Sequence, residues 1–225
     1  MIKRINEEYA KIGIFAVAHG VYWEQFPGLF DNICRYHQDF VSLVRTHPVE
    51  VIDFGIIDSS EKACEKLPEI IAANTDLVIC NMTTYATSSV FAPIIREINS
   101  PLILTALQPR SGLDYKSAST FMQLENDNIC SVPEFTGVAI RMGKKIHDVI
   151  IGTLYGDEKV KKDLALWCSI AKVLHHLKGA RIGLMGHALE AMYDMHADPT
   201  AISAAFGLHV PLLEIDDIIR EYHTV

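Results

Sequence analysis

The chain has 225 residues, 49% hydrophobic and 21% charged, with a net charge of −8 at pH 7, a composition typical of a globular protein with a sizeable core. The acidic balance, with a pI near 5.6, argues against nucleic acid or an anionic membrane as the main partner. No apolar run reaches the ~18 residues of a membrane span, and five scattered cysteines without a CxxC pair indicate reduced thiols in a cytoplasmic protein.

Apolar runs that alternate with helical patterns dominate the first 110 residues. Residues 11–18 form a continuous apolar run that ends in the turn His19-Gly20-Val21-Tyr22. Further runs at residues 49–55, 76–80 and 102–107 are separated by patterns of helical spacing. Strands without polar alternation are expected in a parallel sheet that is buried on both faces. The order therefore predicts right-handed βαβ crossovers in an α/β protein.

The second half of the chain is less regular. Residues 110–133 carry only weak helical hints, and such long excursions are often functional or interfacial. A helix at 133–145, a fifth strand at 147–153 and a long helix at 157–177 follow, and the pattern restarts with short strands at 181–187 and 209–214. We expect an N-terminal α/β domain over residues 1–178 and the beginning of a second, similar domain over residues 179–225. The alternative is that the last strands extend the first sheet.

Four of the expected strands end in residues that can bind a ligand. They are His19 with Tyr22, residues 83–85, Gln108 and His187. Ligands of open α/β sheets bind beyond the carboxyl ends of the strands, so a shared cleft is expected, although loop tips are polar in any protein. No GxGxxG, GxxxxGK[ST] or GxSxG motif occurs, so neither a nucleotide site nor a serine hydrolase is supported.

Two further groups of residues need an explanation. His187, Asp194 and His196 could serve a metal-dependent hydrolase, but their spacing matches no compact ligand motif. Asp198 before Pro199 is better explained as a helix cap. Asp53 lies inside the second apolar run, where a buried carboxylate needs partners.

An ordered set of segments resembles the L-arabinose/L-fucose isomerase family, most closely its arabinose-isomerase side. The segments are KIGIFAVAHGVYWEQFPGL, DLVICNMTTYATSSVFAPIIREINSPLILTALQP, PEFTG before IRMGKKIHDVIIG, and ARIGLMGHALEAMYDMHADPT with the later AAFG. The likeness covers essentially the whole chain but only the N-terminal half of such an enzyme. It implies a three-layer α/β/α domain with a flavodoxin-like, five-stranded parallel sheet, followed by the start of a similar middle domain, in trimers or hexamers.

The resemblance also implies an activity, the manganese-dependent interconversion of an aldose and a ketose. A monosaccharide is then the substrate and Mn²⁺ the cofactor. In that family the metal ligands belong to the middle and C-terminal domains, so they are expected beyond residue 225. No histidine of this chain is carried over as a metal ligand, and no catalytic residue is expected in it.

What the resemblance carries over is one wall of the sugar pocket. His19 stands where the family has a glutamine, Val21 and Tyr22 match the aliphatic and aromatic positions that follow, and Tyr85 matches an aromatic residue after the third strand.

A second contribution to the pocket is expected across a subunit boundary. Asp127 and Cys130 fall near a family histidine that reaches the pocket from a neighbouring subunit. His19 and Cys130 both depart from the family pattern, so the sugar need not be arabinose. A non-catalytic α/β module that binds a sugar or another small molecule is the alternative function.

Overall fold

The computed structural model describes residues 9–224, which divide into two compact units. One unit spans residues 9–172, and the other begins at Val173. Helix α7 (Glu158–Leu177) runs from the first unit into the second. No helix among the described residues is long and apolar enough to cross a bilayer.

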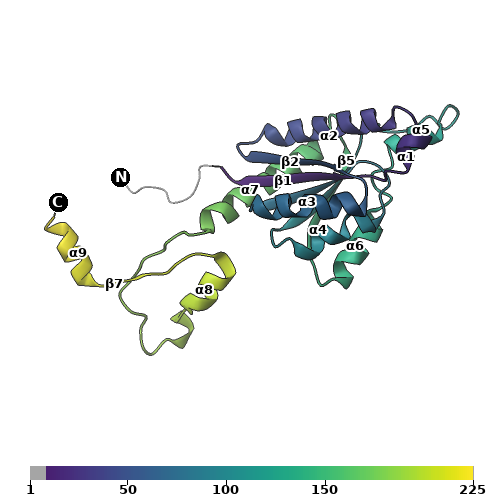
Figure 1. The fold of residues 1–225 in the computed structure, drawn as a ribbon. Helices are drawn as coiled ribbons and strands as arrows, with labels where there is room; N and C mark the ends of the chain where they lie inside the picture. The colour runs from purple at the N-terminus through teal and green to yellow at the C-terminus, as the bar shows by residue number, and fades with distance from the viewer. Residues whose placement is uncertain (1–8, 225) are drawn as a thin grey trace. The chain divides into compact units, whose positions relative to one another are not determined.

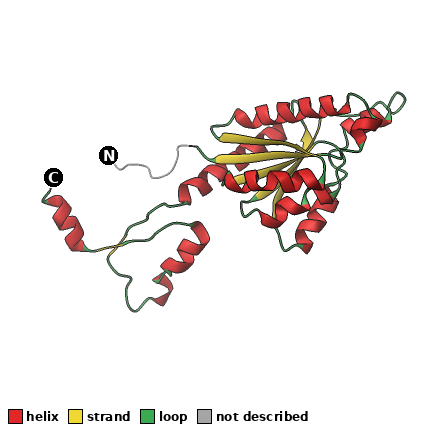
Figure 2. Ribbon diagram, viewed as in Figure 1, coloured by secondary structure: helices red, strands yellow, loops and turns green. Residues whose placement is uncertain are grey.

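The first unit is built on a five-stranded parallel sheet with the strand order β2-β1-β3-β4-β5 (Figures 1 and 2). The strands are β1 (Lys11–Val17), β2 (Glu50–Ile57), β3 (Leu77–Met82), β4 (Leu102–Gln108) and β5 (Ile146–Thr153). Every neighbouring pair is parallel. The three central strands are almost entirely buried, which is why their sequences lack polar alternation. The predicted flavodoxin-like α/β fold is therefore confirmed.

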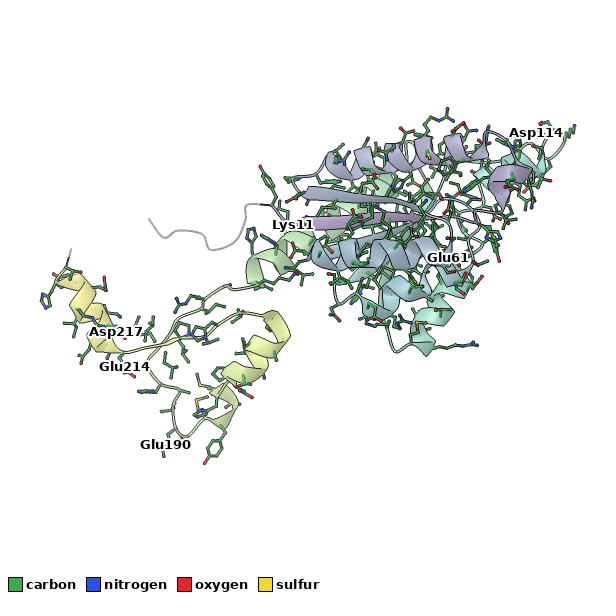
Figure 3. The ribbon with its side chains drawn as sticks, in the orientation of Figure 1. Lys11, Glu61, Asp114, Glu190, Glu214 and Asp217 are labelled. Atoms are coloured by element: carbon green, nitrogen blue, oxygen red, sulfur yellow. The ribbon has the colours of Figure 1, made fainter. Side chains whose placement is uncertain are left out.

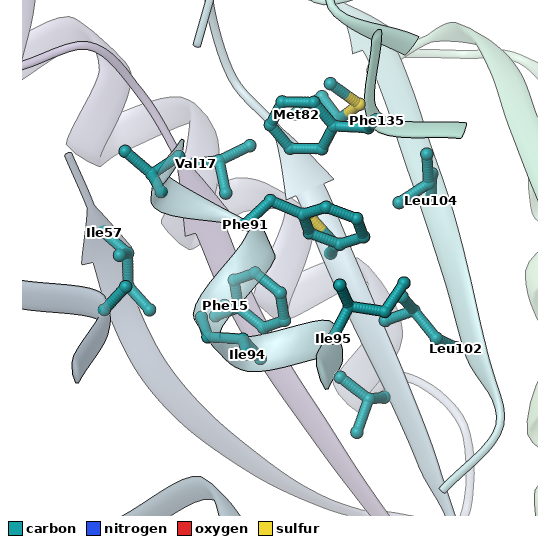
Figure 4. Packing of buried hydrophobic residues seen from close by; sticks show 14 of the residues in the cluster. Phe15, Val17, Ile57, Met82, Phe91, Ile94, Ile95, Leu102, Leu104 and Phe135 are labelled. Atoms are coloured by element: carbon teal, nitrogen blue, oxygen red, sulfur yellow. The ribbon is translucent and has the colours of Figure 1, made fainter. Parts of the chain in front are cut away.

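Helices cover both faces of this sheet and create two apolar layers. α2 (Leu29–Arg45) and α7 pack on one face, where Phe40 and Leu164 join Ile12 in one buried cluster. α3 (Ser60–Ala72), the 3₁₀ turn η1 (Ser88–Val90), α4 (Ala92–Glu97) and α6 (Val132–Arg141) pack on the other. Figure 4 shows this second layer, in which Phe91 stacks on Phe135 with ring centroids 4.6 Å apart.

Two short helices lie in the connections that border the carboxyl edge of the sheet. α1 (Tyr22–Gln25) follows β1 directly. α5 (Thr120–Glu125) belongs to the excursion of residues 109–131 between β4 and α6. Asp114 lies in the exposed loop of this excursion (Figure 3).

The second unit contains a separate two-stranded sheet. β6 (Leu184–Met185) pairs in parallel with β7 (Leu212–Leu213), and both strands are shorter than the apolar runs indicated. The 3₁₀ turn η2 (Tyr193–Met195) and helices α8 (Pro199–Phe206) and α9 (Ile215–Tyr222) complete the unit. These strands do not extend the five-stranded sheet.

Candidate functional site

An aromatic cluster forms at the carboxyl edge of the sheet, where β1 and β3 end side by side. The ring of His19 lies edge-on to Tyr22 and to Tyr85, with centroid separations of 5.1 Å and 6.2 Å. The rings of Tyr22 and Tyr85 are 6.5 Å apart, and Phe26 adds a fourth ring 6.2 Å from Tyr22. The structure thus brings together three of the residues that the sequence singled out. Val21 lies in the same turn with its side chain 56% exposed.

The excursion of residues 109–131 packs across the carboxyl ends of β3 and β4. Asn128 donates from Nδ2 to the carbonyl oxygen of Met82 at 2.7 Å, and the Ser131 hydroxyl accepts from the Ala86 amide at 2.9 Å. These bonds satisfy backbone groups at the last residue of β3 and in the turn that follows it. The Oδ1 atom of Asn128 is buried and has no hydrogen-bond partner within residues 9–224, so it remains an acceptor for a donor that the described chain does not supply.

Asp127 and Cys130 belong to this packed segment and interact electrostatically with Tyr22. Burial raises the pKa of the Asp127 carboxyl, and a hydrogen bond with Cys130 partly offsets that rise. Burial and then the Asp127 charge raise the pKa of the Cys130 thiol. The pKa of Tyr22 is raised by burial first and then by Tyr85, Asp127 and Cys130. The phenol and the thiol therefore stay protonated at neutral pH and can donate hydrogen bonds.

Sequence reasoning missed a buried carboxylate at the same edge, Glu125. Its side chain is 2% exposed and accepts hydrogen bonds from Asn32 at 2.8 Å, Tyr36 at 3.1 Å and Arg110 at 3.3 Å. The bonds from Asn32 and Tyr36 attach the excursion to α2. The polar run Asn126-Asp127-Asn128 next to it is equally typical of a solvated turn, so the sequence carried no specific signal of this burial.

Gln108 ends β4 at this edge and donates from Nε2 to the Asn126 carbonyl oxygen at 2.8 Å, whereas the candidates after residue 180 belong to the second unit. His187 follows β6 in the two-stranded sheet, so its expected place on one sheet edge with His19 was wrong. His187, Asp194 and His196 are all exposed. No group of three or more His, Cys, Asp or Glu side chains that could hold a metal ion occurs within residues 9–224. Asp198 caps α8 by accepting from the Thr200 amide at 2.8 Å, as predicted.

Comparison with known proteins adds little to this geometry. No protein-family model matches the chain, and no curated protein matches it. Among solved structures the chain is similar to the type II dehydroquinase from Propionibacterium acnes, at 15% identity over 71% of this chain and 98% of that chain, with a TM-score of 0.34. A likeness at this level bears on neither the family nor the function of the chain.

Proposed function

We propose that this chain is the N-terminal portion of a metal-dependent aldose–ketose isomerase similar to the L-arabinose and L-fucose isomerases. In this proposal the chain binds a monosaccharide at the carboxyl edge of its five-stranded sheet. The observation that carries the proposal is the convergence of the His19, Tyr22 and Tyr85 rings, with Asp127 and Cys130 close enough to act electrostatically on Tyr22. Small-molecule sites combine aromatic walls with a few polar groups that fix orientation, and this edge supplies both.

The chemistry of these side chains suits a neutral, polyhydroxylated ligand. The aromatic faces provide apolar area that can cover the carbon-bound hydrogens of a sugar ring and exclude water. The Tyr22 phenol and the Cys130 thiol are donors, and the Asp127 carboxyl can donate or accept according to its protonation. These groups can orient hydroxyl groups of a ligand. The Asp127 carboxyl raises the pKa of the Cys130 thiol, so it does not favour the nucleophilic thiolate.

Manganese is the cofactor that the family resemblance implies, and its role would be to polarise the carbonyl and hydroxyl oxygens of the sugar. Residues 9–224 do not fit a manganese site, because no cluster of three candidate ligands occurs among them. The family resemblance implies metal ligands beyond residue 225, and the proposal assigns this chain the pocket wall and subunit contacts. A trimer or hexamer and a cytoplasmic location belong to the same proposal; the five free cysteines support the latter.

A sugar- or small-molecule-binding module without catalysis is the second candidate. It is supported by the composition of the site, whose aromatic rings and polar groups are of the kinds that bind small molecules. Both candidate functions require that a small molecule such as a monosaccharide binds to the aromatic residues at the carboxyl edge of the sheet. They differ in whether the chain works together with metal-bearing domains.

Calorimetric titration of the purified chain with L-arabinose and L-fucose tests the shared part. We expect binding that Tyr85→Ala weakens by about tenfold, the effect of losing roughly 1.4 kcal/mol of aromatic contact. Tyr115→Ala is the matched control, because Tyr115 is 92% exposed. Absence of binding at millimolar sugar, or equal affinity in both variants, refutes the proposed wall.

A second assay separates the two candidates. The gene is sequenced past the codon for Val225, and the chain is assayed with Mn²⁺ and sugar. A continuing reading frame with Glu and His ligands supports the isomerase, whereas a stop codon with retained sugar binding supports the module. Isomerisation by the 225-residue chain alone contradicts the assignment of the metal ligands to later residues.

A further inference from the structure

We propose that Asp53, which lies in β2 away from the aromatic rings, is a positioning residue for the turn that carries His19 and Tyr22. It acts by fixing a bulge in β2, which sets the place of Asp58 at the end of that strand. The relevance of Asp53 to sugar binding rests on the proposed function. The geometric coupling does not.

The bulge is an extra residue in the edge strand β2. Ile14 pairs with Asp53, but Ala16 pairs with Ile56, so β2 gains one residue on β1 between these points. Gly55 has a φ of +77°, a left-handed conformation that favours glycine. Asp53 Oδ1 accepts the Gly55 amide at 2.8 Å, so the carboxylate closes the bulge from its own side chain.

A chain of buried hydrogen bonds holds the Asp53 carboxylate in place. Thr105 donates to Asn81 Oδ1 at 3.1 Å, and Asn81 Nδ2 therefore donates to Nδ1 of His37 at 3.2 Å. This assigns the proton of the neutral His37 ring to Nε2, which lies 2.9 Å from Asp53 Oδ1. Gln38 donates to Asp53 Oδ2 at 2.9 Å. The bonds connect β4 through β3 and α2 to the bulge, so the position of Asp53 is tied to the centre of the sheet.

The end of β2 in turn anchors the turn at the candidate site. The Gly20 amide donates to the Asp58 carbonyl oxygen at 3.0 Å, and Trp23 Nε1 donates to Asp58 Oδ2 at 2.8 Å. A Cβ on Gly20 would lie 3.2 Å from the Asp58 carbonyl oxygen, so the two segments approach closely. His19 and Tyr22 lie within this anchored segment, one residue before Gly20 and one before Trp23. If the bulge were lost, β2 beyond it would slip by one residue relative to β1 and every side chain there would change faces, including that of Asp58.

The two indole N–H signals in a ¹H–¹⁵N spectrum test this coupling directly. Asp53→Asn leaves a single acceptor oxygen, so it turns N–H₂ toward either Gln38 or the shared His37 and Gly55 donors, and it removes the charge from the bonds that remain. Gly55→Ala strains the bulge without touching Asp53. We expect both variants to shift the Trp23 indole signal. The Trp167 indole signal should stay unchanged, because that N–H donates to Asp148 at 2.7 Å. Ile95→Ala, a core change on the opposite face of the sheet, is the control for general loss of stability.

The outcomes separate the inference from the proposed function. A Trp23 signal that moves in Asp53→Asn and Gly55→Ala but not in Ile95→Ala supports the coupling, and a sugar affinity about tenfold weaker in the same two variants supports its role at the site. If Asp53→Asn does not fold, Gly55→Ala decides alone. An unmoved Trp23 signal, or an equal shift in Ile95→Ala, overturns the inference. Absence of sugar binding in the unmodified chain refutes only the proposed function.

Discussion

Substitution of Glu125 tests how the excursion of residues 109–131 is held against the sheet. Its Oε1 atom accepts from Asn32 at 2.8 Å and from Tyr36 at 3.1 Å, while Oε2 accepts from Arg110 at 3.3 Å. Because Asp127 and Cys130 follow in the same segment, loss of these bonds also loosens one side of the candidate site. The effect on stability should depend on which oxygen is changed.

The three hydrogen bonds set the expected magnitude. In Glu125→Gln an amide oxygen at the Oε1 position keeps the bonds from Asn32 and Tyr36 but turns N–H₂ toward Arg110. The lost ion pair is discounted because Arg110 is 45% exposed, so the cost is about 1–2 kcal/mol of unfolding free energy. Glu125→Ala loses all three bonds and costs about 3 kcal/mol.

Urea unfolding followed by circular dichroism measures both values. The control is Glu69→Gln, which removes an exposed pair with Lys66 and should cost about 0.5 kcal/mol or less. Adding Arg110→Ala to Glu125→Gln should cost less than the sum of the single changes, because the two residues share one bond. If Glu125→Ala is as mild as the control, the excursion is not held by this carboxylate and the reasoning fails.

Two further predictions concern close packing and the thiol at the site. Gly13→Ala should lower the unfolding free energy by about 1–3 kcal/mol, because the new Cβ would lie 2.8 Å from Phe54 Cε2. Denaturant unfolding should show a lower midpoint with an unchanged slope. An unchanged unfolding free energy contradicts this prediction. Asp127→Asn should speed the reaction of Cys130 with a thiol reagent at pH 7.5, because the Asp127 charge raises the thiol pKa. The exposed Cys64 is the internal control, and an unchanged Cys130 rate argues against the contact.

The sheet was predictable because each of its strands can be recognised from the hydrophobic pattern of its own short segment. Strands buried on both faces appear as unbroken apolar runs, as the three central strands do, and five strand patterns separated by helical patterns leave few topologies. The bulge in β2 had only a weak local signal, Gly55 two residues after Asp53 inside the second apolar run, and that signal does not give the register of β2 on β1. The cause of the bulge is a set of bonds from α2, β3 and β4, which are distant in the sequence.

Some residues of the candidate site were predictable from the strand order, and others depend on contacts between distant segments. His19, Tyr22 and Tyr85 follow directly after strands, so the sheet topology alone brings them to one edge. Asp127 and Cys130 were indicated only by the family resemblance, and their electrostatic interaction with Tyr22 depends on how the excursion packs. The family and the function stay predictions, because the comparisons leave both untested.

The acid limit of stability offers a test in which two site-related carboxylates act in opposite directions. Burial tends to raise the pKa of Asp53, but hydrogen bonds from His37, Gly55 and Gln38 outweigh it and hold the pKa well below its usual range. Asp53 therefore stabilises the fold above the ordinary aspartate pKa of about 4, and this contribution is lost as the pH falls toward the folded-state value.

The pKa of Asp127 is instead raised, mainly by burial, so its contribution is present below about pH 4 and is lost as the pH rises through the folded-state pKa. Urea unfolding between pH 3 and pH 7 should show the gap between the unmodified chain and Asp53→Asn widening with pH. For Asp127→Asn the sign reverses, and the variant should gain stability relative to the unmodified chain as the pH rises. Because each measurement is a difference between two chains, the other carboxylates cancel. A flat difference for Asp53→Asn would mean that the bonds from His37 and Gly55 do not favour the charged carboxylate, and the basis for its positioning role would be lost.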